Sequence, residues 1–215
     1  MYEALAKVNR TDAAIRTLLQ TGFPSFGAEI YSKYEPSTML WESWTGDTMR
    51  QWLDESSRGH HYQASINTFL RRYVAGLDMP EGIGGWSVVK VRPEASLLPA
   101  DLADEIPGAA ASSATHRGLV HTAWRRNSST GTVTVAATIP AGATAELHVP
   151  LSFGLHRTRI TESGRLVWAA GAPLLHGEAR GGLAGIASAS TDGRFAIFSC
   201  SRSGTYTFVT AQAAQ

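Results

Sequence analysis

The spacing of apolar residues changes near residue 80, and this change constrains the fold more than any other feature of the sequence. Between residues 60 and 76, apolar side chains recur at the three- and four-residue spacing of one helix face: Tyr62, Ile66, Phe69, Leu70 and Tyr73. From Gly84 onward, apolar and polar residues alternate with the period of a strand. Helices followed by strands indicate an α+β protein of more than one part. We therefore expect a helical part over 1–80 and a strand part over 84–215.

The helical part is predicted to hold three recognisable helical stretches. Residues 2–8 form a short one, and Thr11 is a plausible N-cap for a helix over 12–20. The clearest helix covers 60–76, with Gly76 as its stop. Between them, residues 22–58 contain Gly, Pro and Ser breakers, which indicate loops and short helices.

The strand part is predicted to be an antiparallel β-sandwich, because short alternating segments are separated by Gly, Pro and Ser. About eight segments fit this pattern: 86–92, 118–125, 132–139, 145–149, 157–161, 164–168, 194–200 and 204–210. Residues 94–115 are rich in Ala and Pro and show no clear period. We expect them to form a long connection over the surface.

Composition excludes several classes of function. Lys plus Arg is 19 and Asp plus Glu is 18, a balance that predicts neither a nucleic-acid partner nor an anionic membrane partner. No segment reaches the ~18 apolar residues of a membrane span. Residues 1–5 lack the features of a signal peptide, so we expect a cytoplasmic location if Met1 is the true start. The single Cys200 excludes an intrachain disulfide, and the histidines lack metal-site spacing, so no metal or cofactor is expected.

Two polar-aromatic clusters are candidates for chemistry. In Trp41-Glu42-Ser43-Trp44, a carboxylate lies between two indoles; sugars stack on aromatic faces, and a nearby carboxylate can activate water or protonate a leaving oxygen. The alternative is that both tryptophans are core residues at helical spacing and Glu42 is solvated. In His60-His61-Tyr62, an imidazole could bind a hydroxyl or orient a water. The alternative there is a histidine satisfied by backbone at a helix start.

At these residues the sequence resembles the α-L-rhamnosidases of glycoside hydrolase family 78. That family has segments of the form L-L-x-Q-T-x-x-P-S-W-G, T-x-L-W-E-x-W, N-H-Y and Y-x-A-G in this order. The corresponding segments here are 18–27, 38–44, 60–62 and 73–76. Strand segments such as Gly118–Trp124 are also similar to that family's sandwich.

The resemblance implies a site and an architecture. Glu42 matches the general base that activates water in an inverting mechanism, and His61 matches a histidine that contacts rhamnose. Trp41 and Trp44 would then line the sugar site. The helices would be the last of an (α/α)6 barrel, followed by a C-terminal β-sandwich. The expected partner is a rhamnose-containing oligosaccharide or glycoside.

Departures from the family pattern leave alternatives open. The family's general acid lies in an earlier barrel loop, and no acidic residue here matches it, so we expect the chain to carry the general-base half of a site and to be inactive alone. It could instead be a non-catalytic carbohydrate- or protein-binding module, or part of a rhamnosyl-glucuronate lyase. So few helices cannot cover all their apolar side chains, which predicts a partner chain or self-association. These side chains include Leu18, Leu19, Phe69, Leu70 and Tyr73.

Overall fold

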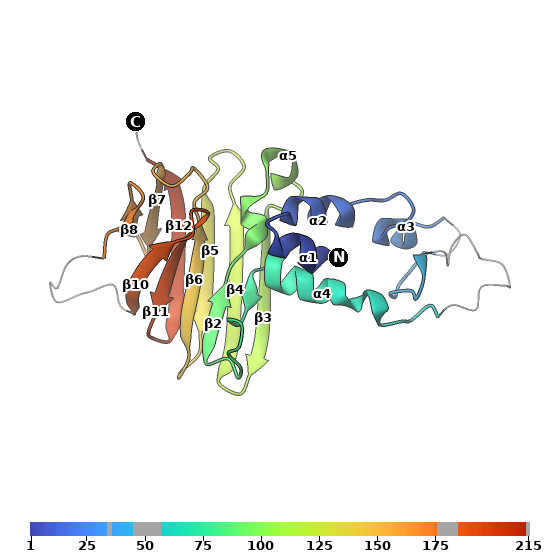
Figure 1. Cartoon of the computed structure of the whole chain (residues 1–215), viewed down its shortest axis with the longest axis horizontal. Coiled ribbons are helices and arrows are strands. Elements are labelled where there is room, and N and C mark those ends of the chain that lie inside the picture. The colour runs from blue at the N-terminus through green and yellow to red at the C-terminus, as the bar shows by residue number, and fades with distance from the viewer. Residues whose placement is uncertain (34–35, 45–56, 176–184, 214–215) are drawn as a thin grey trace. The chain divides into compact units, whose positions relative to one another are not determined.

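The computed structural model describes residues 1–33, 36–44, 57–175 and 185–213. The chain divides into two compact units, Met1–Leu70 and Arg71–Gln215 (Figure 1). This division lies before the boundary predicted between residues 80 and 84. The reason is that strand β1 (Leu77–Asp78) already pairs with a strand of the sandwich. The two units correspond to the helical and strand-rich parts, so the α+β fold class is confirmed.

The described part of unit 1 contains short helices only. They are α1 (Tyr2–Lys7), α2 (Thr11–Leu18), α3 (Phe26–Ile30), the 3-10 turn η2 (Tyr62–Ser65) and α4 (Ile66–Phe69). Ile15 of α2 and Phe69 of α4 are completely buried, and the Tyr2 ring of α1 lies 5.6 Å from that of Phe69. The core of unit 1 therefore forms where α1, α2 and α4 meet.

Two helix predictions need correction. Thr11 is the first residue of α2, and Arg10 occupies the N-cap position without a side-chain hydrogen bond that caps the helix. The helix predicted over 60–76 is not uniform: η2 and α4 are followed by a π-helical turn, η3 (Leu70–Val74). Its predicted stop is confirmed, since Gly76 adopts the left-handed conformation at a φ of 82°.

Unit 2 is built from two sheets (Figure 1). The first has the order β1-β2-β6-β11-β10, from β1, β2 (Val88–Val91), β6 (Thr144–Pro150), β11 (Phe195–Cys200) and β10 (Ile186–Thr191). The second has the order β3-β4-β5-β12-β7-β8-β9. Its strands are β3 (Gly108–Thr115), β4 (Gly118–Arg126), β5 (Val133–Ile139), β12 (Gly204–Gln212), β7 (Thr158–Glu162), β8 (Arg165–Ala169) and β9 (Ala172–Pro173).

The alternating sequence pattern produces the core of this sandwich. Along β5, Val133, Val135 and Ala137 are buried while the residues between them are partly exposed. The ring of Phe198 in β11 stacks on that of Phe208 in β12 with centroids 4.7 Å apart, so side chains of the two sheets meet. Burial of one such side chain contributes roughly 1.5–3 kcal/mol, and this alternation therefore drives the association of the sheets.

Three features of unit 2 differ from the prediction. Residues 94–115 are not one long connection: they contain η4 (Glu94–Leu97), α5 (Ala100–Ala103) and β3. β3 pairs with β4 along its whole length at a sheet edge, where backbone hydrogen bonds suffice without apolar alternation. The edge strand β10 was also not predicted, for the same reason. Finally, β2 pairs with β6 in parallel, so the sandwich is not purely antiparallel.

Among the described residues, no helix is long and apolar enough to cross a membrane. In that same part of the chain, no group of three or more His, Cys, Asp or Glu side chains could hold a metal ion.

Candidate functional site

The two candidate segments of unit 1 lie side by side. The backbone N–H of Glu42 donates to the carbonyl oxygen of Ser57 over 2.9 Å, and the N–H of His60 donates to that of Leu40 over 2.8 Å. These two hydrogen bonds connect the segment carrying Glu42 to the segment that leads into His61. Residues distant in sequence are therefore brought together at one place.

Glu42 presents its side chain to solvent. Its Oε2 atom accepts a hydrogen bond from the backbone N–H of Ser57 at 2.9 Å, so Ser57 orients the carboxylate. An exposed carboxylate held by a backbone donor is placed to accept a proton from a bound water.

The two indoles beside Glu42 differ in their surroundings. Trp41 is only 2% exposed, with the guanidinium of Arg58 4.8 Å from its ring centroid, whereas Trp44 is half-buried. The Trp44 ring meets Phe26 edge to face with centroids 5.0 Å apart. Residues 41–43 are not helical, so helical spacing does not explain this motif. Trp41 is a core residue of unit 1, and Trp44 retains exposed surface.

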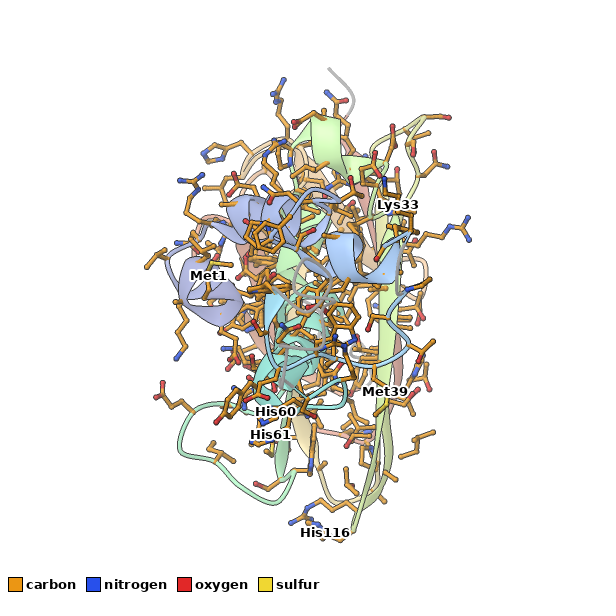
Figure 2. The ribbon with its side chains drawn as sticks, turned by 90° about the vertical axis from the view of Figure 1, so that its right-hand side faces the viewer. Met1, Lys33, Met39, His60, His61 and His116 are labelled. Carbon is orange, nitrogen blue, oxygen red and sulfur yellow. The ribbon has the colours of Figure 1, made fainter. Side chains whose placement is uncertain are left out.

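Three rings cluster at the start of η2. The ring centroids of His60 and His61 are 4.8 Å apart, and that of Tyr62 lies 4.0 Å from His60 and 5.1 Å from His61 (Figure 2). His60 Nδ1 accepts the N–H of Tyr62 at 3.3 Å, while the side chain of His61 is exposed. His61 is therefore the histidine of this pair that is more available to a ligand.

Glu29 is a residue of this region that the sequence did not single out. It lies in α3, is 3% exposed, and accepts hydrogen bonds from the Gln63 side chain and the Trp41 backbone N–H. Burial raises the pKa of its carboxyl group, although both hydrogen bonds act in the opposite direction. A five-residue helix is too short to produce a periodic pattern, so no sequence pattern indicates a buried acid here.

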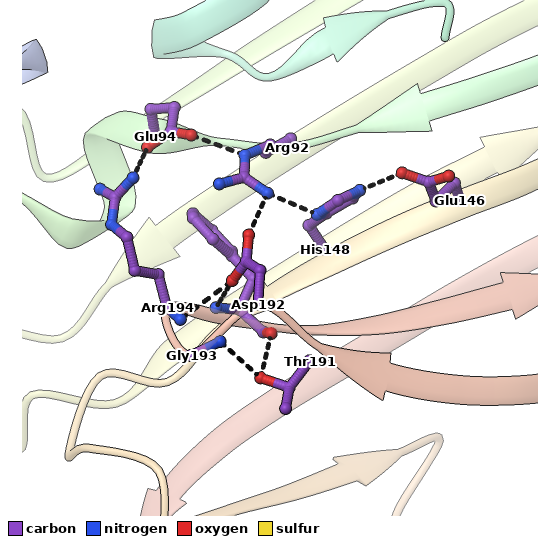
Figure 3. Close-up of polar contacts among 9 residues, drawn as sticks. Arg92, Glu94, Glu146, His148, Thr191, Asp192, Gly193 and Arg194 are labelled. Carbon is purple, nitrogen blue, oxygen red and sulfur yellow. Dashed lines mark hydrogen bonds and ion pairs between the residues drawn. The ribbon is translucent and has the colours of Figure 1, made fainter. Parts of the chain in front are cut away.

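Unit 2 contains a second polar cluster, centred on Arg92 (Figure 3). Arg92 Nε lies 2.6 Å from the Glu94 carboxylate, and its Nη1 atom lies 2.6 Å from Asp192 and 3.0 Å from His148 Nδ1. Arg194 reaches the other oxygen of Glu94 at 2.9 Å. This cluster joins the end of β2 to β6 and to the turn that connects β10 with β11.

The protonation of His148 follows from its partners. A guanidinium can only donate, so His148 Nδ1 must accept from Arg92, and its Nε2–H donates to Glu146. Burial, and then the charge of Arg92, lower the pKa of His148, although Glu146 opposes this. Burial alone would raise the pKa of Asp192, but hydrogen bonds from Arg92 and two backbone N–H groups lower it to about 2. These groups connect β2, β6 and the β10–β11 turn within the first sheet.

Comparison with protein families assigns both units. A model described as the bacterial alpha-L-rhamnosidase 6 hairpin glycosidase domain matches residues 1–74, and one described as the bacterial alpha-L-rhamnosidase C-terminal domain matches residues 76–164. The chain belongs to the bacterial α-L-rhamnosidase family. Of its residues, Trp41, Glu42, Trp44 and His61 all lie within the match to the glycosidase domain.

Individual α-L-rhamnosidases agree with this assignment. The enzyme of Streptomyces avermitilis is 30% identical over 153 residues, which cover 70% of this chain and 14% of the relative. A crystal structure of a Streptomyces avermitilis α-L-rhamnosidase complexed with L-rhamnose matches 97% of this chain and 17% of that chain with a TM-score of 0.69 and 25% identity. The α-L-rhamnosidase of Dictyoglumus thermophilum shares the fold over 98% of this chain and 20% of its own, with a TM-score of 0.73 and 19% identity. The chain thus spans at most a fifth of these relatives.

Proposed function

We propose that this chain carries the general-base half of an inverting α-L-rhamnosidase site that removes terminal α-L-rhamnose. The observation that carries the proposal is the position of Glu42: a solvent-facing carboxylate, held by the Ser57 N–H, inside the part matched by the glycosidase domain. The segment beside it brings in His61, which we assign to a rhamnose hydroxyl. The exposed part of Trp44 would contact the sugar, and the buried Trp41 would support Glu42 from behind.

In this mechanism Glu42 takes a proton from water as the water oxygen attacks the anomeric carbon. The bond from that carbon to the glycosidic oxygen breaks, and a general acid protonates the leaving oxygen. Attack on the face opposite the leaving group inverts the configuration. Because an inverting site needs two carboxyl groups roughly 6.5–9.5 Å apart, the acid must come from another part of the enzyme.

The first test is the activity of the 215 residues alone. We expect no hydrolysis of p-nitrophenyl α-L-rhamnoside, and no difference between the chain and its Glu42→Gln variant. Hydrolysis at ordinary enzyme rates that Glu42→Gln abolishes would contradict the half-site and would show that an acid is present within this chain.

The second test restores a complete barrel. The segment of the Streptomyces avermitilis α-L-rhamnosidase that aligns with this chain is replaced by residues 1–74 of this chain, leaving its own C-terminal domain in place. We expect the graft to hydrolyse the rhamnoside and Glu42→Gln to lower kcat by about 10²–10⁴-fold. A folded Glu42→Gln graft that is as active as its parent would refute the assignment and favour a non-catalytic module.

Two product analyses test the mechanism in the same graft. Azide needs no deprotonation, so it should restore turnover to Glu42→Ala and form the inverted rhamnosyl azide. Hydrolysis in ¹⁸O-water should place the label at the anomeric carbon of the released rhamnose. On a rhamnosyl-glucuronate substrate, an unlabelled rhamnose accompanied by an unsaturated uronate would instead indicate the elimination reaction of a lyase.

A further inference from the structure

Helix α3 is held in place by features that depend on particular residues. Ser25 caps it, accepting the Ala28 N–H on its side-chain oxygen at 3.0 Å. A Cβ atom added at Gly27 would lie 2.4 Å from the carbonyl oxygen of Gln20, so only glycine permits this close approach to the preceding segment. The position of α3 is therefore fixed by its cap and by its backbone contact.

One face of α3 supports the segment that carries Glu42. Phe26 and Glu29 are three residues apart, which places them on the same side of the helix. The Phe26 ring meets Trp44 edge to face with centroids 5.0 Å apart, and the Glu29 carboxylate accepts the backbone N–H of Trp41. Contacts on either side of Glu42 thus come from one helix.

The same carboxylate also reaches the second segment. Gln63 Nε2 donates to Glu29 Oε1 at 3.4 Å, and Gln63 follows His61 by two residues within η2. Glu29 is consequently bound to the residue directly before Glu42 and to a residue of the turn that His61 begins.

The burial of Glu29 separates its role from that of Glu42. Glu29 is 3% exposed, whereas Glu42 faces solvent, so Glu29 cannot reach a sugar in this arrangement. A buried carboxylate is unfavourable unless its hydrogen bonds compensate. Both of its identified donors belong to the segments that present the proposed site residues.

We propose that Glu29 is a positioning residue, which sets the Glu42 segment and the His61 turn relative to one another through the Trp41 N–H and the Gln63 amide. It does not contact the substrate. The connection of the two segments through Glu29 is argued from these contacts. Only its effect on catalysis rests on the proposed function.

The link can be tested in the 215-residue chain by ¹H–¹⁵N NMR, without any activity. The backbone amide signal of Trp41 and the side-chain amide of Gln63 should titrate with a common midpoint, which Glu29→Gln should abolish. In Glu29→Leu the Trp41 amide should exchange with deuterium at least about tenfold faster, since it loses its acceptor. Ile30→Ala, at an exposed neighbour on α3, is the matched control and should leave both signals unchanged.

Two results would overturn the link. One is a Trp41 amide that neither titrates with Glu29 nor changes its exchange rate in Glu29→Leu. The other is an equal loss of protection in α1 and α2, which would assign Glu29 to the folding of unit 1 as a whole. If Glu29→Leu does not fold, the titration in wild type and Glu29→Gln still decides.

The effect of Glu29 on catalysis is tested in the rhamnosidase graft. Glu29→Leu should lower kcat about 10–100-fold with a smaller effect on KM, as expected when a catalytic group is displaced. Glu29→Gln, whose amide oxygen can still accept the Trp41 N–H, should recover most of that loss. Equal losses in the two variants would refute positioning by hydrogen bonding. If Glu42→Gln proves harmless, the proposed function fails while the NMR result for Glu29 stands.

Discussion

Ser57 and Glu42 exchange two hydrogen bonds: the Ser57 N–H donates to Glu42 Oε2 at 2.9 Å, and the Glu42 N–H donates to the Ser57 carbonyl oxygen at 2.9 Å. The backbone of Ser57 therefore holds both the backbone and the side chain of Glu42. The two segments should separate if the Ser57 donor is removed.

Ser57→Pro removes that donor and Ser57→Ala retains it, so the two variants form a matched pair. We expect Ser57→Pro to raise the deuterium exchange rates of the Glu42 and His60 amides about tenfold or more. Among the contacts of the described residues, Ser57→Ala removes the one from the Gly59 N–H to the Ser57 hydroxyl, and this variant should exchange like wild type. Equal exchange in the two variants would show that the Ser57 N–H does not hold the Glu42 and His60 segments together.

How far the sequence predicts this site depends on the range of the interactions. Alternation along β5 predicts a half-buried strand, because the polarity of each side chain indicates whether that residue is buried. The contact between the Glu42 and His60 segments joins residues far apart in sequence through backbone groups, which every residue carries. The expectation that Glu42 and His61 share one site comes from the resemblance to α-L-rhamnosidases and from their places at the ends of helical segments.

The burial of Glu29 and the strand β3 were not predicted, for related reasons. A charged residue on a five-residue helix is ordinarily solvated, and no local pattern distinguishes a buried one. β3 consists of small residues and is stabilised by backbone pairing with β4, so its side chains carry little strand signal. Both features depend on a neighbour supplied by the tertiary fold.

The neutral state of His148 predicts a pH dependence for the stability of the sandwich. Its pKa in the folded protein is lowered from the ordinary 6.5, so the unfolded chain binds the proton more readily. The stabilising contribution is complete above pH 6.5 and is lost as the pH falls through the folded-state pKa. Urea unfolding should therefore show a decreasing free energy of unfolding between about pH 7 and pH 5.5, above the range of ordinary carboxyl groups.

Variants distinguish His148 from the other histidines. His148→Asn offers Arg92 an acceptor but does not titrate, so it should remove this part of the pH dependence even if it lowers stability overall. His116→Asn, at an exposed position, is the control and should retain it. A wild-type slope that survives in His148→Asn would assign the dependence to another group.

Gly76 allows the chain to pass from the helical segment into β1. A Cβ atom there would lie 2.4 Å from the Pro93 nitrogen and 2.6 Å from the Arg92 carbonyl carbon, and its φ of 82° disfavours other residues. Gly82 has a similar φ of 76°, but nothing lies within 4 Å of the corresponding position. Comparison of the two positions separates steric overlap from backbone strain.

Gly82→Ala should therefore lower the free energy of unfolding by about 1–2 kcal/mol, the strain of the left-handed conformation. Gly76→Ala should lower it by about 2–5 kcal/mol, because the overlap with backbone adds to the strain. Urea denaturation followed by near-ultraviolet circular dichroism measures both. Equal losses would mean that the backbone near Pro93 moves readily to accommodate a side chain.

Unit 1 presents several large apolar side chains to solvent, as its small number of helices predicts. Leu19 is 40% exposed, Phe23 56% and Ile30 52%, although Phe69, which the sequence placed among those left uncovered, is completely buried. Such exposed surface commonly marks an interface. We propose that this surface is covered by a partner chain or by a second copy, so the chain alone should self-associate.

Light scattering over a range of concentrations, together with binding of a hydrophobic dye, tests this surface. The double variant Phe23→Ser/Ile30→Lys should reduce both association and dye binding at least severalfold, because it removes two large apolar side chains that are more than half exposed. Leu119→Lys, at a position in unit 2 that is 57% exposed, is the matched control and should change neither. A wild-type chain that remains monomeric at every concentration and binds no dye would show that these side chains are tolerated in water without a partner.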